Sequence, residues 1–592
     1  MVFVLALWLR LAGSGWDDWA GLHPDERHLI FALSDALAGL AQAQGTGWGE
    51  LWFATGLSPL DPRGGGRFYV YGGLPHLTMT LLAHARAVVG WEGLLALTRN
   101  TTAIIDAYTC LAVFMLAMLL LRHGAAALAA CFFYAVAPLA LQHANFFTVD
   151  PWLTAAVAWG LVAAVLLAAE TRPRRALLWA ALAGALAAVA LACKLPGALL
   201  CPGLVAAAYV RLRRHRSKGR LAVELALSVV VFLVTLRLVA PFSFAGPGLL
   251  DLRPSPAMIG AYLEAARVAG SPEFPPNWQW MAGYGPLQAL RDMALMALGP
   301  ALAAAAGVGV ATGIGAAVTQ RGRGAQCGRN AWRRATPLIL VTTGFCAYGL
   351  FGRPPMLRYM LPAVPGLCVV AGAAMAGLWD SWRGRGVVLA VLGCALFWGA
   401  GMARLHSALP NSRIAASYWL WANTGPGVVI AHESSWDESL PLPVRLDDRP
   451  ERIWPEQGGR FAFVNLGLEA PETPAKAARI AEALDRADLL VISSERLRRP
   501  MLALPGRFAM TGAYYALLAD GRLCFAPVYR SRSVYPLPGL PLADGWVQEP
   551  WSVYDHPAVE IYRKTGCFAR AQVEARLLAA LDTNAASRGE AQ

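Results

Sequence analysis

The stretch WLTAAVAWGLVAAVLLAAETRPRR (residues 152–175) starts with a long uncharged apolar run and ends in three arginines. An apolar run of this length is typical of a helix that crosses a membrane. The whole chain has the same character, since 56% of its 592 residues are hydrophobic and 15% are charged, with a mean hydropathy of +0.44. One soluble core could not bury so much apolar surface, so the sequence predicts a membrane protein with many spans.

Basic clusters alternate with apolar runs from here to the last apolar segment, and this alternation indicates the topology. Lysine and arginine concentrate in the cytoplasmic loops of membrane proteins, so the net charge of +13 reports topology and does not indicate a nucleic-acid partner. The spans predicted in this way are residues 152–169, 176–193, 197–210, 221–240, about 290–318, 337–351, 360–379 and 387–403. They place Asp150, Lys194, the large loop 241–290, the segment 353–359 and everything after residue 404 on the outer face.

The N-terminal third is harder to thread. Residues 1–16, MVFVLALWLRLAGSGW, predict a first transmembrane helix, and the first outer loop, 17–67, follows it. Three apolar stretches then come before Asp150, and three crossings would put this loop and Asp150 on opposite faces. We expect the first of these stretches, 69–90, to be re-entrant or interfacial, because proline, histidine and arginine interrupt it. Residues 1–403 are thus predicted to form a polytopic α-helical transmembrane domain with about 11–13 spans.

The composition changes after residue 404. VVIAHESSWD (428–437) and ADLLVISSERL (487–497) are typical of strands that run into polar loops, and KAARIAEALDRA (476–487) is typical of a helix. We therefore predict that residues 404–592 form a soluble α/β domain on the outer face. Eight of the ten cysteines lie in or beside apolar runs, whereas Cys524 and Cys567 lie in this domain and could pair if it is exported.

A polar motif, HPDERHLIF, begins at His23 in the first outer loop. Pro24 followed by Asp25 and Glu26 is how a helix ordinarily begins, and that is one interpretation. In the other, Asp25 and Glu26 join Asp150, of FFTVDPWL, in a carboxylate cluster. Such a cluster suits a general base, or a divalent metal cation held by Asp25 and Asp150, with His23 or His143 beside them. Asp150 could equally be a helix cap.

Three cations lie at the outer boundary of the predicted spans. Lys194 interrupts an apolar context in CKLPG, and Arg353 and Arg358 lie in FGRPPMLRYMLPAVPG. Each could anchor its helix by reaching toward the interface. Alternatively they bind a lipid phosphate, to which arginine offers a two-pronged donor and lysine a point charge.

The second large outer loop contains SPEFPPNWQWMAGYGP (271–286), in which Trp278, Trp280 and Tyr284 are close together. These aromatic side chains could form an interfacial belt. They could also bind a sugar, since aromatic faces pack on the C–H groups of a pyranose ring.

In combination, these motifs resemble those of a known superfamily. HPDE, FFTVDPWL, CKLPG, RYMLPAVPG and an exported C-terminal domain occur here in the order found in the GT-C membrane glycosyltransferases. Within these, residues 1–405 resemble the bacterial relatives of protein O-mannosyltransferases and of the lipid A aminoarabinose transferase. The resemblance implies transfer of a sugar from a polyprenyl-phosphate donor to an acceptor hydroxyl at the outer face of the bacterial cytoplasmic membrane, normally with inversion.

The resemblance also implies roles for residues. Asp25 matches the acidic residue of the first loop, which acts as base or orients the acceptor, with Glu26 beside it, and Asp150 matches the second acidic position. Lys194 and Arg358 are assigned to the phosphate by their chemistry and by their side of the membrane. The acceptor could be a protein, a lipid or a glycan.

Two other functions fit the same sequence. A transporter or flippase for lipid-linked sugars would use Lys194 and Arg358 but need no chemistry from Asp25, so Asp25→Asn distinguishes it from an enzyme. A scaffold protein would work through its exported domain, but an anchor needs only one span and no lysine in an apolar context.

Overall fold

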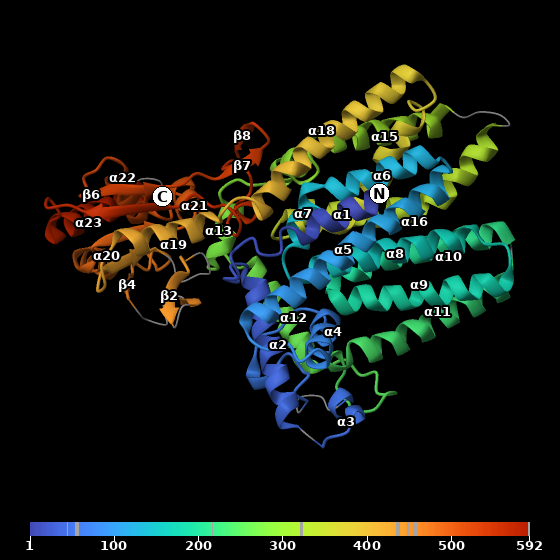
Figure 1. Cartoon of the computed structure of the whole chain (residues 1–592), viewed down its shortest axis with the longest axis horizontal. Coiled ribbons are helices and arrows are strands. Elements are labelled where there is room, and N and C mark those ends of the chain that lie inside the picture. The colour runs from blue at the N-terminus through green and yellow to red at the C-terminus, as the bar shows by residue number, and fades with distance from the viewer. Residues whose placement is uncertain are drawn as a thin grey trace. The chain divides into compact units, whose positions relative to one another are not determined.

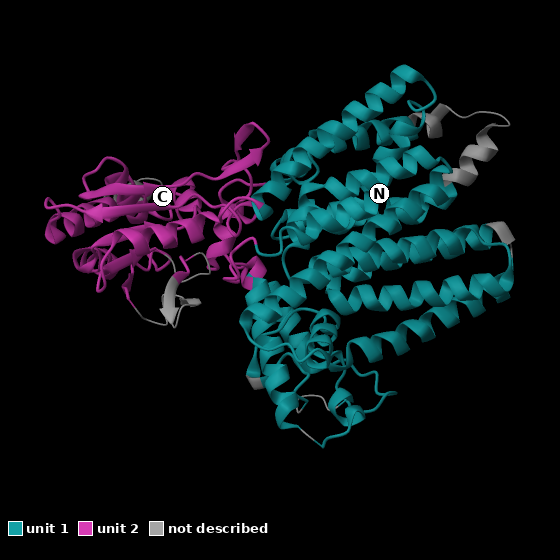
Figure 2. Ribbon diagram, viewed as in Figure 1, with its two compact units in different colours: residues 1–15, 25–268, 286–407 teal, residues 16–24, 269–285, 408–592 magenta. Residues whose placement is uncertain are grey.

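The computed structural model describes residues 1–43, 45–53, 58–215, 217–319, 324–433, 439–446, 449–453 and 460–589. The chain divides into two compact units, which Figure 2 shows in different colours. Unit 1 contains residues 1–15, 25–268 and 286–407, and unit 2 contains residues 16–24, 269–285 and 408–592. Two short pieces of the predicted outer loops are therefore part of unit 2, although they lie within residues 1–403, the predicted transmembrane domain.

Unit 1 is built from helices (Figure 1). Its α-helices are α1 (Val2–Leu11), α2 (Pro24–Gln42), α3 (Trp48–Phe53), α4 (Gly73–Ala85), α5 (Trp91–Leu121), α6 (Gly124–Val136), α7 (Pro138–Ala144), α8 (Val149–Ala169), α9 (Pro173–Cys193), α10 (Cys201–His215), α11 (Lys218–Val239), α12 (Pro256–Gly270), α14 (Pro286–Asp292), α15 (Pro300–Thr319), α16 (Gly324–Phe351), α17 (Val364–Ala376) and α18 (Trp382–Ser407). Short 3-10 or π turns join some of them: η1 (Gly64–Gly66), η2 (Leu195–Leu200), η3 (Pro241–Ser243), η5 (Met293–Ala297) and η6 (Leu357–Ala363).

Among the described residues, seven helices are long and apolar enough to cross a membrane. The number rises to nine if two bent pairs, α6 with α7 and α14–η5 with α15, each count as one span. The two pairs bend by 53° and 117°. These helices confirm the predicted polytopic helical membrane protein, with fewer spans over the described residues than the 11–13 expected.

The first helix is shorter than predicted. α1 has ten residues, about 15 Å at 1.5 Å per residue, whereas a span needs about 30 Å. Its Arg10 is fully buried, and Nε donates to Asp106 Oδ2 of α5 at 2.6 Å. Arg10 Nη1 also donates to the carbonyl of Ala135 at 3.0 Å. An ion pair inside the helical bundle thus explains the arginine in an apolar segment.

The stretch 69–90 does not form a full span. Its helix α4 has 13 residues, about 20 Å, which is too short to cross the hydrocarbon layer. Only α5 and the bent pair α6–α7 then separate the first outer loop from Asp150. Two crossings return the chain to the same face, which removes the conflict in the predicted topology.

Unit 2 has an α/β architecture, as predicted. Its elements are η4 (Pro275–Asn277), α13 (Trp278–Met281), α19 (Ser412–Asn423), β1 (Val429–His432), β2 (Leu442–Leu446), β3 (Arg449–Ile453), β4 (Ala462–Asn465), α20 (Pro474–Arg486), β5 (Leu489–Ile492), α21 (Arg498–Ala503), α22 (Ala509–Ala519), β6 (Phe525–Arg530), β7 (Val534–Leu537), β8 (Leu540–Ala543), η8 (Glu549–Trp551), β9 (Glu560–Lys564) and α23 (Arg570–Gly589). The main sheet has the strand order β4-β1-β5-β9-β6. β4, β1 and β5 are parallel, and β9 runs antiparallel to β5 and β6.

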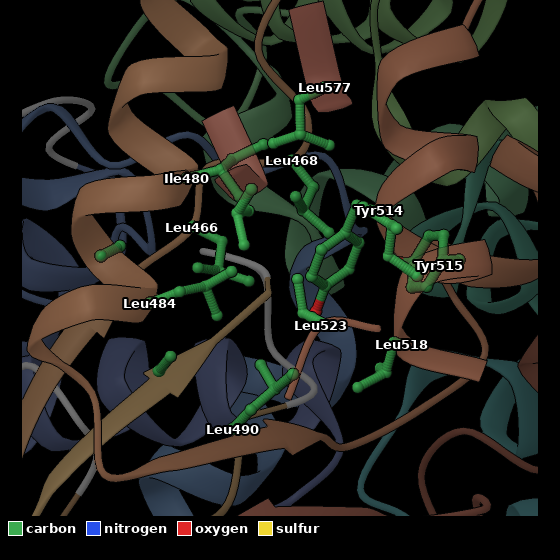
Figure 3. Packing of buried hydrophobic residues seen from close by; sticks show 14 of the residues in the cluster. Leu466, Leu468, Ile480, Leu484, Leu490, Tyr514, Tyr515, Leu518, Leu523 and Leu577 are labelled. Atoms are coloured by element: carbon green, nitrogen blue, oxygen red, sulfur yellow. The ribbon is translucent and has the colours of Figure 1, made fainter. Parts of the chain in front are cut away.

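The core of unit 2 lies between this sheet and its helices (Figure 3). Ile480 and Leu484 of α20, Leu490 of β5 and Tyr514 of α22 are fully buried in it. Trp278, from the segment 269–285, also belongs to this core, with its ring centroid 4.7 Å from that of Phe508. That segment therefore completes the core of unit 2.

A disulfide joins Cys524, which directly precedes β6, to Cys567, which follows β9. The two Cα atoms are 5.6 Å apart. The predicted pairing is confirmed.

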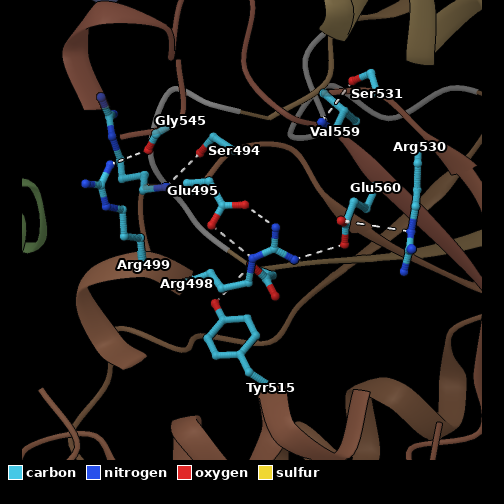
Figure 4. Close-up of polar contacts among 12 residues, drawn as sticks. Ser494, Glu495, Arg498, Arg499, Tyr515, Arg530, Ser531, Gly545, Val559 and Glu560 are labelled. Carbon is cyan, nitrogen blue, oxygen red and sulfur yellow. Dashed lines mark hydrogen bonds and ion pairs between the residues drawn. The ribbon is translucent and has the colours of Figure 1, made fainter. Parts of the chain in front are cut away.

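Charged side chains gather where the parallel strands β1 and β5 end (Figure 4). Arg498 binds Glu495 and donates through Nη1 to Glu560 Oε2 at 2.9 Å. The buried carboxyl group of Glu433, directly after β1, accepts hydrogen bonds from the hydroxyls of Tyr514 and Tyr515 at 3.0 and 3.1 Å. Each of these carboxyl groups therefore has a donor.

Candidate functional site

The first half of the site is an ion pair between Asp25 and Arg358. Asp25 lies in the first turn of α2, where Pro24 and a carboxylate favour the start of a helix. Arg358 lies in η6, and its Nη1 donates to Asp25 Oδ2 at 2.5 Å. Both side chains are about one fifth exposed, at 21% and 20%. The motif HPDE is thus both a helix start and a point of contact with a distant arginine.

The second half is an ion pair between Asp150 and Lys194. Asp150 lies in the first turn of α8 and is buried, and Lys194 caps the C-terminus of α9. Lys194 Nζ donates to Asp150 Oδ1 at 2.8 Å. The side chain of Lys194 keeps 15% exposure.

Tyr359 connects the two ion pairs. Its ring centroid lies 4.8 Å from Lys194 Nζ and 5.6 Å from Arg358 Cζ. Four segments of the chain therefore form one cluster of two carboxylates and two cations, which we call the carboxylate–cation cluster: Asp25, Asp150, Lys194 and Arg358.

Tyr71, for which the sequence predicted no role, lies beside the carboxylate–cation cluster. Its hydroxyl makes a hydrogen bond with Asp25. Burial and the Asp25 carboxylate raise the pKa of Tyr71 well above its ordinary value, so the phenol keeps its proton and donates. The motif FYVY that precedes α4 was the available signal, but its aromatics resemble ordinary packing residues.

Glu26 does not face this cluster. It is fully buried, and Arg99 of α5 donates to it from Nε at 2.9 Å and from Nη2 at 2.6 Å. The backbone N–H of Phe147 donates to the same carboxylate at 2.8 Å. This environment does not fit the predicted catalytic role of Glu26, and we assign it the structural role of tying α2 to α5.

The candidate metal ligands are already engaged by cations. Asp25 binds Arg358 and Asp150 binds Lys194. In the part of the chain that the structure describes, no three His, Cys, Asp or Glu side chains group in a way that could hold a metal ion. Two carboxylates with cationic partners are a poor ligand set for a divalent metal.

Arg353 is exposed and stays outside the cluster. Within the described ranges it forms no ion pair, unlike Arg358 five residues later. The predicted phosphate contact from Arg353 therefore finds no support in the geometry.

The predicted sugar-binding aromatics lie in unit 2. The proposed role of Trp278 is wrong, because the side chain is 1% exposed and its ring faces the core. Trp280 and Tyr284 are partly exposed, with ring centroids 5.1 Å apart, and sugar binding by this pair stays a prediction.

His23 also belongs to unit 2, although it is only two residues from Asp25. It is buried, and its ring centroid is 4.4 Å from that of Tyr554. A contact between His23 and an acceptor stays a prediction. His143, in contrast, lies in unit 1 and close enough to Asp150 to act on it electrostatically.

Comparison with known proteins gives matches to solved structures alone. No family model matches the chain, and no curated protein sequence matches it either. The crystal structure of the apo oligosaccharyltransferase of Archaeoglobus fulgidus aligns over 92% of this chain and 74% of its own, with 14% identity and a TM-score of 0.48. The same enzyme in complex with Zn and sulfate aligns over 92% and 73%, with 14% identity and a TM-score of 0.47.

The crystal structure of ArnT from Cupriavidus metallidurans, bound to undecaprenyl phosphate, aligns over 96% of this chain and 98% of its own. The identity is 15% and the TM-score 0.44. Both enzymes are members of the GT-C superfamily that the sequence motifs resemble. With TM-scores below 0.5, these likenesses assign no activity to the chain.

Proposed function

We propose that this protein is a membrane glycosyltransferase that moves a sugar from a polyprenyl-phosphate donor to an acceptor hydroxyl. The carboxylate–cation cluster is the observation that carries the proposal. Its two cations, Lys194 and Arg358, are the groups that a lipid phosphate needs, and Asp25 is a base beside them. The disulfide Cys524–Cys567 supports an outer, oxidising location for unit 2.

In this scheme Asp25 is the general base. It takes the proton of the acceptor hydroxyl while the acceptor oxygen forms a bond to the anomeric carbon of the donor sugar. The bond from that carbon to the phosphate oxygen breaks, and its electron pair leaves with the polyprenyl phosphate. A single displacement of this kind inverts the anomeric configuration. Tyr71 acts as a positioning residue, because its hydrogen bond orients the Asp25 carboxylate.

Lys194 and Arg358 stabilise the leaving phosphate. Without donor, each cation is held by a carboxylate, at 2.8 and 2.5 Å. A bound phosphate competes for both cations. When Arg358 binds the phosphate, it releases an oxygen of the Asp25 carboxylate, which can then accept a proton. Polyprenyl phosphate departs as a stable anion, so one base and two cations are sufficient and no general acid is needed. Asp150 keeps Lys194 in place and is a positioning residue.

The first test follows donor turnover in membranes that contain wild type or Asp25→Asn, measured as release of labelled polyprenyl phosphate. General bases contribute about 10²–10⁴-fold to rates, so we expect the variant to lose at least about 100-fold. Asp520→Asn is the matched control, because Asp520 is an exposed carboxylate of unit 2 that binds Arg522. Equal turnover by wild type and Asp25→Asn, at equal protein levels, would favour the transporter for lipid-linked sugars.

A second arm of this test concerns the phosphate. Added polyprenyl phosphate should inhibit turnover, and Arg358→Gln should raise the inhibitory concentration by about 10- to 100-fold, because a charge-assisted hydrogen bond contributes about 1.5–3 kcal/mol. Arg353→Gln is the control from the same segment and should leave inhibition unchanged. Equal effects of both substitutions would remove Arg358 from the phosphate site.

A further inference from the structure

A cavity lies in unit 1, in the part predicted to face outward. It is a cavity of about 800 Å³ between residues 61–69 and the segment 245–264, and this volume lies within the range of small-molecule sites, about 300–1,000 Å³. Helix α12 contributes Ala257, Gly260, Ala261 and Glu264 to one wall. These positions recur every three or four residues, so they share one face of the helix. The mechanism proposed above uses none of the residues that line this cavity.

The charges in the cavity are balanced. Arg63 pairs with Asp61, from Nε at 2.9 Å and from Nη2 at 2.7 Å. It also donates to Ser255 Oγ and to the carbonyl of Phe242, both at 2.9 Å. Arg67 pairs with Asp35. Arg63 thus uses four of its five N–H donors within the protein, so it has little left to offer a phosphate or another anion.

The other lining groups are an aromatic ring and a carboxylate between small residues. Phe68 is 51% exposed although it is large and apolar. Glu264 faces the cavity from α12 and binds Arg267 at 2.7 Å near the surface. An exposed ring can cover the C–H face of a sugar, and carboxylates and guanidinium groups can bind its hydroxyls. A neutral, polyhydroxylated ligand matches this combination better than an anion or a purely apolar molecule.

The cavity is linked to the carboxylate–cation cluster by aromatic side chains. Tyr69 lines the cavity, and its ring centroid lies 5.6 Å from that of Tyr71. Tyr71 in turn bonds to Asp25. His28, one turn after Asp25 on α2, lies 6.0 Å from Tyr69 between ring centroids. Two tyrosine rings, Tyr69 and Tyr71, thus connect the cavity lining to the proposed base.

We propose that this cavity binds a neutral saccharide and is the acceptor subsite of the transferase. Its role as acceptor subsite rests on the function proposed above, whereas saccharide binding itself does not. Of the acceptor classes that the sequence leaves open, this assignment selects a glycan.

Gly260 offers the most direct way to close the cavity. A Cβ added at Gly260 would meet no atom within 4 Å, so Gly260→Trp should extend into the cavity without displacing the backbone. Ala266→Trp is the matched control, because Ala266 is an exposed small residue on the opposite face of α12. Both variants are compared with wild type for yield and for elution in size-exclusion chromatography.

The test uses the full chain in lipid nanodiscs, because maltoside detergents would themselves present sugar. Fluorescently labelled protein is applied to an array of neutral and anionic glycans. We expect wild type and Ala266→Trp to bind neutral glycans. The fluorescence of bound Gly260→Trp should be at least tenfold lower. Absence of glycan binding by wild type, a preference for anionic glycans, or equal binding by well-folded Gly260→Trp would each overturn the proposal.

Asp25→Asn separates this proposal from the proposed function. It should bind the same glycans as wild type but turn over no donor. If Asp25→Asn keeps donor turnover, the transferase mechanism fails while the saccharide site stands. The last outcome concerns Gly260→Trp. If this variant no longer binds glycans but still transfers sugar, at the wild-type rate, to the glycans that wild type binds, the cavity is not the acceptor subsite.

Discussion

At the scale of single residues, Asp25 and Glu26 show how strongly position on a helix decides the environment of a carboxylate. They are neighbours in the first turn of α2, and consecutive residues of a helix point about 100° apart. Asp25 is 21% exposed and binds Arg358, whereas Glu26 has no exposed surface and binds Arg99. One carboxylate can meet a substrate and the other cannot.

Glu26→Gln should therefore lower stability. Removing one partner of a buried ion pair costs about 3–5 kcal/mol, because the remaining charge stays buried, and the substitution leaves Arg99 without its anion. We expect a clear drop in the melting temperature of the protein in detergent micelles. Asp25→Asn, at a partly exposed pair, should melt close to wild type, and equal melting of Glu26→Gln and wild type would contradict the structural role of Glu26.

Sequence reasoning brought Asp25, Asp150, Lys194 and Arg358 to one face of the membrane but could not pair them. Asp25 and Arg358 are 333 residues apart in the chain, and no local pattern links positions so distant. Tyr71 was missed and Trp278 was misassigned for the same reason. An aromatic residue in a loop looks the same in sequence whether it contacts a carboxylate or fills a core.

At the scale of elements, the apolar runs predicted the middles of the helices well and their ends poorly. The run 152–169 became α8, Val149–Ala169, which starts early enough to place Asp150 in its first turn. α1 and α4 are shorter than their apolar stretches, because buried contacts and the loops around them set their ends. In unit 2, the predicted strands are β1 and β5, whereas β6 escaped prediction because Pro527 interrupts it, and a proline argues against a strand in a sequence.

The disulfide should contribute to the stability of unit 2. Cys524–Cys567 connects the start of β6 to the loop between β9 and α23, across 43 positions of sequence. Cross-links of this loop length contribute about 2–4 kcal/mol, so Cys524→Ser should make unit 2 unfold at lower urea, as followed by protease cleavage of the full chain. Cys394→Ser, at an exposed free cysteine, is the control. An unchanged urea midpoint for Cys524→Ser would show that the pairing between β6 and β9 is sufficient.

At the scale of the whole molecule, unit 2 is assembled from three separate parts of the chain. The segment 16–24 is held by Arg413, which donates to the carbonyl of Leu22 at 3.3 Å, and by Tyr418, which donates to Asp18 at 3.0 Å. The segment 269–285 is held by the burial of Trp278 and by Gln548, which donates to Tyr284 at 2.9 Å. The unit is therefore more than the stretch after the last span.

The stability of this unit should depend on pH through Glu433. Burial raises the pKa of Glu433 from 4.5 to about 8, although Tyr514, Tyr515 and Arg498 act in the opposite direction and Glu495 adds to the rise. The folded carboxyl thus keeps its proton where the unfolded one has lost it, so the free energy of unfolding falls as pH rises from about 4.5 to 8.

His556 has the same sign at higher pH. Burial alone would lower its pKa, but Asp544, whose Oδ2 lies 2.6 Å from Nε2, raises it from 6.5 to about 10. We expect the free energy of unfolding of unit 2 to fall by on the order of a few kcal/mol between pH 5 and pH 8. A lower melting temperature at pH 8 would show this fall. Glu433→Gln should flatten this fall, and an unchanged slope would place its origin elsewhere.

The burial of Trp278 against Phe508 also has a consequence for how the protein is made. The tryptophan leaves the ribosome 230 positions before its partner, a delay on the order of 10–50 s at about 5–20 residues per second. Throughout that time a large apolar ring has no core to enter, although several later helices are being inserted into the membrane. Nascent chains stalled between these two positions should therefore be good substrates for chaperones, and the last strands to be synthesised would end that dependence.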